Sequence, residues 1–123
     1  MSEKKFTLWN RLAAAAVFVV AAITYLLTIE PTASFWDCGE FIASSYKLEV
    51  GHPPGNPVFQ LFARFFTMFF DNMHAAVAVN AMNAICSALT IFFLYLTIVF
   101  FAKRVVKPSD DGTYTVGKAV AIF

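Results

Sequence analysis

The feature that most constrains this chain is an uncharged stretch over residues 75–102, which contains no acidic or basic side chain. A helix rises 1.5 Å per residue, so about 20 apolar residues cross the hydrocarbon core of a bilayer. The stretch is longer than that, so the predicted transmembrane helix tilts or extends past the bilayer. Asn80, Asn83 and Ser87 share one face of it, where we expect them to pack against other helices rather than lipid.

A second uncharged run, residues 12–29, is rich in Ala, Val, Ile and Leu and predicts another transmembrane helix. A signal peptide is the alternative, with the basic residues before it as the n-region. The spanning helix is favoured because the run exceeds a usual h-region and no small-x-small cleavage site follows it. Composition agrees: 14% of residues are charged and 59% hydrophobic, against about 25% charged in soluble domains.

Orientation follows from the basic residues that flank the two runs, because cytoplasmic segments carry an excess of Lys and Arg. Lys4, Lys5 and Arg11 precede the first run, Lys103, Arg104 and Lys107 follow the second, and only Lys47 and Arg64 lie between them. Residues 1–11 and 103–118 are therefore predicted to be cytoplasmic, and residues 30–74 to lie outside. If the protein is bacterial, the membrane is the inner (plasma) membrane.

Residues 119–123 are expected to begin a third span, so the chain is predicted to be an N-terminal fragment of a multi-pass protein. The fold class expected is all-α integral membrane: two transmembrane helices joined by an outer loop with short interfacial helices. The net charge is +1 and no basic stretch is interleaved with aromatic residues. A bilayer is thus an expected partner and nucleic acid is not.

The first half of the outer loop is predicted to hold a short helix over residues 35–48, after Pro31 ends the first span. Thr32 or Ser34 is expected to cap it. Asp37 and Glu40 are three residues apart, so both carboxylates would share one face of this helix.

The second half of the loop begins with residues 51–57, Gly-His-Pro-Pro-Gly-Asn-Pro, which predict a rigid, non-helical turn. Residues 58–70 follow as a strongly apolar helix in which Gln60 and Arg64 are the strongly polar side chains. This helix is too short to span a membrane, so we expect it to lie in the interface. Asp71-Asn72 is expected to end it.

Each of these polar residues also has a purely structural interpretation. A carboxylate at Asp37 is favoured near a helix N-terminus by the helix dipole alone. His52 can hydrogen-bond within the turn, and Arg64 can extend to the lipid headgroups. Cys38 is expected to be a small packed residue, and a disulfide between it and Cys86 is not expected. The sequence carries neither a nucleotide-binding glycine loop nor a His/Cys metal-ligand spacing.

Residues 36–41 (Trp-Asp-Cys-Gly-Glu-Phe), followed by residues 51–57, resemble the first outer loop of a family once catalogued as a domain of unknown function. This family includes the animal protein O-mannosyltransferase of plexin-type receptors and many bacterial relatives. The shared pattern is an Asp-x-Gly-Glu element, then a His-Pro-Pro-Gly element about a dozen residues later. This sequence departs from it with an aromatic pair before the Asp, and with Asn56 where an aromatic residue is common.

The resemblance implies the N-terminal part of a GT-C glycosyltransferase, which takes a sugar from a polyprenyl-phosphate carrier. It implies Asp37 as the catalytic base, with Glu40 assisting or binding a metal. His52 and Arg64 are then expected to contact the donor phosphate, and Lys47 is a further candidate for substrate binding. The acceptor would be an exported protein or glycan. Some GT-C enzymes use a divalent metal ion and others do not, so the resemblance leaves the cofactor open.

A different class of function stays open beside this one. The chain could belong to a non-catalytic membrane subunit or a transporter, in which Asp37 and Glu40 contact an ion or a partner protein. The fragment alone is expected to be inactive under the first hypothesis, because the other helices of the family are missing from it.

Overall fold

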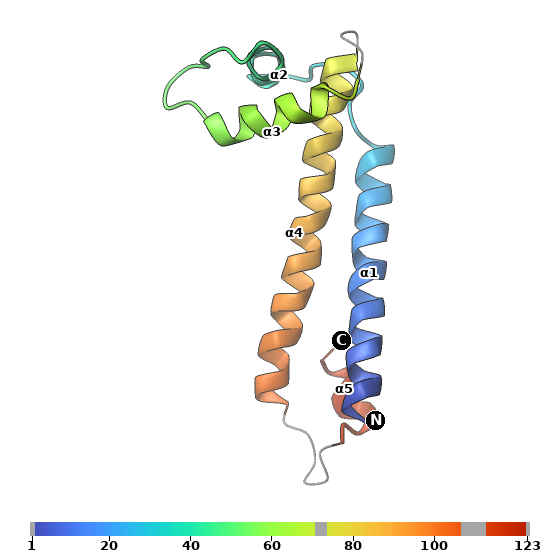
Figure 1. Cartoon of the computed structure of the whole chain (residues 1–123). Coiled ribbons are helices and arrows are strands. Elements are labelled where there is room, and N and C mark those ends of the chain that lie inside the picture. Colours follow the sequence, from blue (N-terminus) through green and yellow to red (C-terminus); the bar gives the residue numbers. More distant parts are fainter. Residues whose placement is uncertain (1, 71–73, 107–112, 123) are drawn as a thin grey trace. The chain divides into compact units, whose positions relative to one another are not determined.

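The computed structural model describes residues 2–70, 74–106 and 113–122, and within those residues it is helical without any β-strand. The helices are α1 (Glu3–Leu27), α2 (Cys38–Lys47), α3 (Pro57–Thr67), α4 (Ala75–Val105) and α5 (Val116–Val120) (Figure 1). The chain divides into two compact units, one of Met1–Ile23 with Ser87–Phe123 and the other of Thr24–Cys86. Both α1 and α4 contribute residues to each unit.

The two longest helices coincide with the two apolar runs of the sequence. Helix α1 has 25 residues and α4 has 31, and both are long and apolar enough to cross a membrane. At 1.5 Å per residue, α4 is about 46 Å long, which exceeds the roughly 30 Å of a hydrocarbon core. The helix is thus longer than a span requires, and its crossing of a membrane stays a prediction.

Helix α1 begins nine residues before the predicted span and ends two residues earlier than predicted. The early start has a local and a tertiary cause. Glu3 lies in the first turn, where a negative charge interacts favourably with the helix dipole and stabilises the helix. Phe6 is fully buried, and its ring stacks on that of Tyr114 with centroids 4.9 Å apart. The predicted cytoplasmic N-terminus is thus mostly the first turns of a helix.

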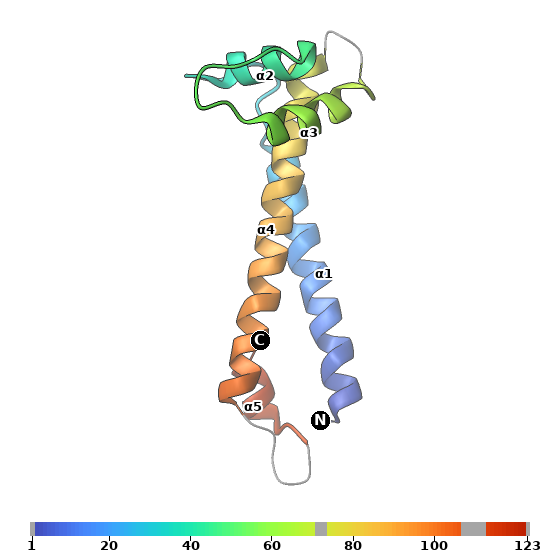
Figure 2. The ribbon, with the colours of Figure 1, turned by 60° about the vertical axis from the view of Figure 1, so that its left-hand side comes forward.

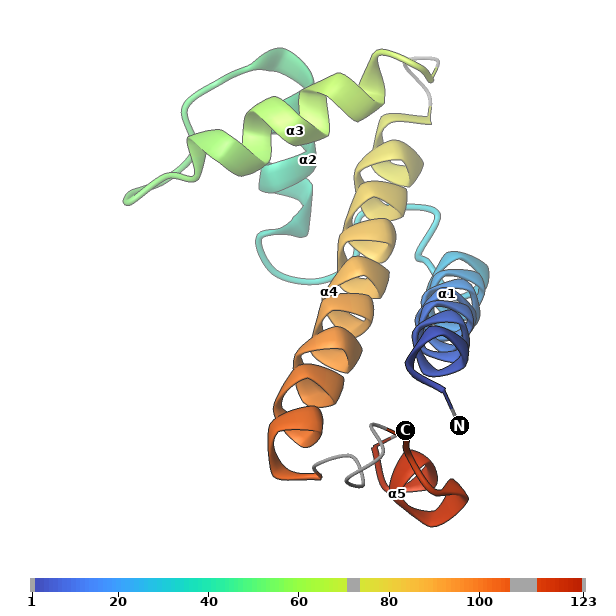
Figure 3. The same ribbon diagram turned by 60° about the horizontal axis from the view of Figure 1, so that its bottom comes forward.

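The first unit has a small core around Phe6, which also includes Val99, Ala119 and Ile122. The hydroxyl of Tyr95 donates a hydrogen bond to Oδ1 of Asn10 at 3.0 Å. Helix α5 lies close to the beginning of α1 (Figure 3), in agreement with these contacts. Residues 108–112, Pro-Ser-Asp-Asp-Gly, predict a turn by their composition, and they lie outside the described residues.

The second unit is built on α2 and α3, which pack against each other. Helix α2 is seen end-on in Figure 1 while α3 lies in the plane, and Figure 2 shows α2 above α3, so the two helices cross. Ala63, Val79 and Met82 are the buried centre of this unit. Helix α3 contributes Ala63, and α4 contributes the other two.

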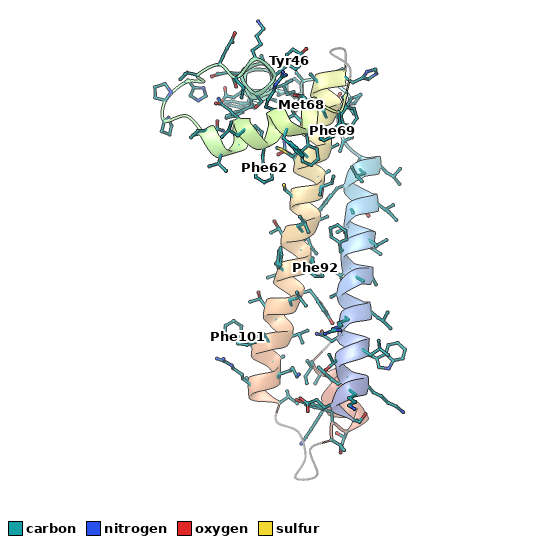
Figure 4. All side chains as sticks on the ribbon, in the orientation of Figure 1. Tyr46, Phe62, Met68, Phe69, Phe92 and Phe101 are labelled. Atoms are coloured by element: carbon teal, nitrogen blue, oxygen red, sulfur yellow. The ribbon has the colours of Figure 1, made fainter. Side chains whose placement is uncertain are left out.

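Helix α3 covers most of the predicted interfacial segment, and its two sides have different surroundings. One face packs on α2 and the start of α4, whereas the other leaves large apolar side chains exposed. Phe62 projects from α3 on the side away from α2 (Figure 4). The exposed large apolar residues of this segment are Val58, Leu61, Phe62, Phe65, Met68, Phe69 and Phe70. The predicted end of the helix at Asp71-Asn72 lies outside the described residues.

Helix α2 begins later than predicted, and the expected cap is wrong. Trp36 has φ 63°, a left-handed conformation that an α-helix of L-residues does not continue through. The helix therefore begins at Cys38, with Asp37 as its N-cap and no side-chain capping bond. Thr32 instead donates its hydroxyl to Glu30 Oε1 at 2.9 Å. Asp37 thus lies at the end of the helix rather than on one of its faces.

Candidate functional site

The best-defined polar contact of the second unit joins Glu40 of α2 to His52 of the proline-rich turn. Oε1 of Glu40 accepts the backbone N–H of His52 at 2.7 Å. Nδ1 of the imidazole lies 2.9 Å from both carboxylate oxygens. A carboxylate can only accept hydrogen bonds, so Nδ1 carries the proton. The other ring nitrogen, Nε2, is then the atom through which His52 can act on a substrate.

This contact depends on a glycine beside it. A Cβ added to Gly51 would lie 3.2 Å from Oε1 of Glu40 and 3.4 Å from Nε2 of Gln60. The first distance is shorter than ordinary van der Waals contact, so a side chain at residue 51 would press on the carboxylate that holds His52. Gly39, in the Asp-x-Gly-Glu element, has the nearest such neighbour at 3.8 Å, an ordinary contact.

The contact perturbs the acidity of both partners. Hydrogen bonds from the backbone and then the side chain of His52 lower the pKa of Glu40 below its ordinary 4.5. The hydrogen bond to Glu40 raises the pKa of His52 above its ordinary 6.5, and the charges of Glu40 and Asp37 add to that effect. Asp37 is therefore near enough to act on the imidazole electrostatically, although the direct partner of His52 is Glu40.

Asp37 borders an open pocket of about 390 Å³ within the second unit. The pocket wall is largely aromatic, with Phe35, Trp36, Phe41 and Phe59. Its polar side chains, besides Asp37, are Asn56, Asn80 and Asn83. Cys38 also contributes, as a half-buried free thiol. Cys86, on α4, is exposed and is not part of a disulfide.

The two predicted basic ligands lie elsewhere in this unit. Nη1 of Arg64 donates to the backbone oxygen of Tyr46 at 2.7 Å, and its guanidinium lies 5.2 Å from the centroid of the Tyr46 ring. It thereby links α3 to the last turn of α2, where the helix dipole favours a cation. Lys47 is 3.8 Å from Glu49 in an exposed ion pair, a type of contact that contributes little to stability. Their roles toward a substrate stay predictions.

A metal at Asp37 and Glu40 fits the described residues poorly. No group of three or more His, Cys, Asp or Glu side chains in the described part of the chain is arranged to hold an ion. The carboxylate of Glu40 is engaged by His52 through both of its oxygens. We therefore derive no step through a metal from these residues.

Two asparagines of the pocket were missed as site residues by the sequence analysis. Nδ2 of Asn80 donates to the backbone oxygens of Glu30 at 2.7 Å and Thr32 at 3.2 Å, so it holds the start of the loop. It was expected to pack against another helix instead. Asn56 is the N-cap residue of α3. Its amide oxygen is buried and has no hydrogen-bond partner among the described residues. The only sequence signal for Asn56 was that it stands where an aromatic residue is common in the family.

Two long apolar helices, with a pair of short crossed helices in the segment between them, define a helical protein of the membrane-associated class. The family model described as the Protein O-mannosyl-transferase TMEM260 N-terminal domain matches residues 37–123. The chain belongs to this family. The match begins at Asp37 and includes Glu40 and His52, and the resemblance noted in the sequence is thereby confirmed.

Two curated relatives agree with this assignment. Protein O-mannosyl-transferase tmem260 of Dictyostelium discoideum is 30% identical over 90 residues, which are 72% of this chain and 11% of the relative. Protein O-mannosyl-transferase TMEM260 of Mus musculus is 32% identical over 83 residues, which are 68% of this chain and 12% of the relative. The chain thus spans about a tenth of the length of either relative. No solved structure matches it.

Proposed function

We propose that this chain is the N-terminal part of a GT-C membrane glycosyltransferase that moves a mannosyl group from a polyprenyl-phosphate donor to a hydroxyl of an exported protein. The names of its relatives support the sugar and the protein acceptor. The lipid carrier is what the resemblance of residues 36–41 and 51–57 to the GT-C family implies, and it suits a loop that we propose to lie at a membrane surface.

The proposed arrangement in the membrane follows the charge bias of the sequence. Residues 12–29 and 75–102 cross the bilayer, residues 1–11 and 103–118 are cytoplasmic, and residues 30–74 face outward. The exposed apolar face of α3 lies in the outer interface, and a third span starts near residue 119. The full-length protein is then a multi-pass enzyme of the plasma or an internal membrane.

The observation that carries the proposed chemistry is the position of Asp37 at the edge of an aromatic pocket, where its charge helps to raise the pKa of the His52 imidazole. Asp37 would accept the proton of the acceptor hydroxyl while the new C–O bond forms at the anomeric carbon. The bond from that carbon to the phosphate oxygen breaks at the same time. The negative charge of Asp37 also favours the oxocarbenium-like transition state.

His52 has the complementary role toward the leaving phosphate. Glu40 holds Nδ1 and favours the protonated ring, so Nε2–H can donate to the departing phosphate oxygen. Glu40 is then a positioning residue for His52 and not itself a base. Arg64 and Lys47 are further cations of the same loop that we propose to favour binding of the anionic carrier.

The test replaces Asp37 by Asn in the full-length protein and measures mannosyl transfer from a polyprenyl-phosphate mannose to an acceptor peptide. Asp37→Asn keeps the size and polarity of the side chain but removes the base, so kcat should fall by about 10²- to 10⁴-fold. Glu49→Gln is the matched control, because Glu49 is an exposed carboxylate of the same loop. Transfer by Asp37→Asn at the parental rate would overturn the assignment and favour the non-catalytic alternative.

A further inference from the structure

The most unusual polar atom of the second unit is the amide oxygen of Asn56. Asparagine at an N-cap ordinarily accepts a hydrogen bond from the first turn of the helix. Here the side chain makes no capping bond. The oxygen is nevertheless buried and has no partner among the described residues. Buried acceptors are rarely left unsatisfied in folded proteins, so this one calls for a hydrogen-bond donor.

Asn56 also lines the open pocket beside Asp37, so an occupant of that pocket is a candidate source of this donor. That pocket has about 390 Å³ of space, within the range of small-molecule sites. A purely hydrocarbon ligand, such as the chain of a lipid, would fit the aromatic wall but would leave Oδ1 of Asn56 unsatisfied. The occupant must therefore combine apolar surface with hydroxyl or N–H groups.

The rim of the pocket adds a second observation. Trp36 is 95% exposed and Phe35 89% exposed, although both are large aromatic residues. Trp36 also has a left-handed backbone, with φ 63°. Such a conformation is uncommon outside glycine and asparagine, and strain of this kind gathers at ligand sites. Two flat apolar rings are thus presented next to the carboxylate of Asp37.

We propose that this pocket binds the pyranose ring of the sugar that is transferred, with Trp36 against the C–H face of the ring and Asn56 accepting one of its hydroxyls. A pyranose has the required two-sided chemistry, with C–H groups on its faces and hydroxyls at its edge. The assignment rests on the proposed function and makes Trp36 and Asn56 donor-specificity residues. Asn80 has a different role, because its amide nitrogen donates to the backbone oxygens of Glu30 and Thr32 and so holds the start of the loop.

The experiment measures binding and transfer separately in the full-length protein. Binding of polyprenyl-phosphate mannose is measured at equilibrium in the Asp37→Asn background, so that it does not require catalysis. The KM for the same donor and the KM for an acceptor peptide are measured in the parental background. Trp36→Ala and Asn56→Ala are the test variants. Trp36→Phe preserves an aromatic face, and Trp9→Ala is a matched control on an exposed tryptophan of α1.

Loss of the aromatic contact or of the acceptor should weaken donor binding and raise the donor KM by about tenfold each. Trp36→Phe should restore most of the affinity, and Trp9→Ala should leave it unchanged. Methyl α-mannopyranoside should compete with the donor in the parental protein and lose this effect in Trp36→Ala.

Three results would overturn the proposal. The first is donor affinity unchanged in both test variants. The second is a raised KM for the acceptor peptide alone, which would assign the pocket to the acceptor. The third combines two observations: sugar-free polyprenyl phosphate competes with the donor less well in the two variants, and methyl α-mannopyranoside does not compete at all. This result would assign the pocket to the lipid carrier. Donor binding is measured in the Asp37→Asn background, which lacks the proposed base. A negative result for the pocket therefore does not change the result of the test of Asp37 as the catalytic base.

Discussion

Replacing Gly51 by Ala tests whether the contact between Glu40 and His52 governs activity. The added methyl group would lie 3.2 Å from Oε1 of Glu40, so that oxygen must move by a few tenths of an ångström to reach ordinary contact. Oε1 now accepts the backbone N–H of His52 at 2.7 Å. After the move this distance is about 3 Å, which is still a hydrogen bond. The contact should therefore be displaced rather than broken.

The displacement sets the expected size of the effect. A misplacement of about 1 Å at a catalytic group can reduce the rate 10²-fold. By the same scale, a shift of about 0.3 Å in the carboxylate that holds His52 should lower kcat about fourfold. Gly51→Val adds two more methyl-sized groups next to the same oxygen, so it should separate Glu40 from His52 and lower kcat by about 10²-fold.

The assay is mannosyl transfer by the full-length variants at saturating donor and acceptor, with thermal unfolding measured in parallel. Gly39→Ala is the matched control, since its methyl group would meet only Ala33 at 3.8 Å. It should keep the parental rate. The reasoning fails if Gly51→Val transfers as fast as the parent while remaining folded, or if Gly39→Ala is as impaired as Gly51→Val.

Two further predictions concern the charges of the loop. Glu40 raises the pKa of His52 above 6.5, so the protonated ring and its stabilising contact are fully present below pH 6.5 and are lost as the pH rises through the raised pKa. The alkaline limb of the pH profile of kcat/KM should therefore lie above pH 6.5 and move toward that value in Glu40→Gln; an unmoved limb would contradict the assignment of His52. Arg64→Gln removes a charged hydrogen bond to the backbone of Tyr46, which should destabilise the protein to thermal or denaturant unfolding by about 1–3 kcal/mol. Arg64→Lys, compared in the same experiment, should recover part of that loss, and unchanged stability in both variants would show that the link between α2 and α3 is dispensable.

Run length and charge were sufficient to predict the two long helices, because an uncharged segment of that length has few alternatives to a membrane helix. They could not predict that α1 begins at Glu3. That start depends on the burial of Phe6 against Tyr114, a contact over more than a hundred residues of sequence. Local patterns contain no information about such a partner.

The sequence did not predict the geometry of the candidate site. Asp37, Glu40 and His52 were singled out by the family resemblance, and the spacing of the two carboxylates suggested that they share one helix face. The structure pairs Glu40 with His52 instead, because the proline-rich turn returns residue 52 to α2. The left-handed conformation of Trp36, which moves the helix start to Cys38, has no signature in a tryptophan. The catalytic roles themselves stay predictions.

The bonds from Asn80 to Glu30 and Thr32 impose an order on the making of this loop. The donor lies 50 residues after the first of its acceptors along the chain. At a synthesis rate of about 5–20 residues per second, those two carbonyls wait roughly 3–10 s for their partner. Val79, Asn80 and Asn83 also complete the wall of the pocket, so the pocket cannot exist until the second long helix has been made. A chain cut before residue 79 would therefore carry Asp37 and His52 but would lack this wall of the pocket beside Asp37.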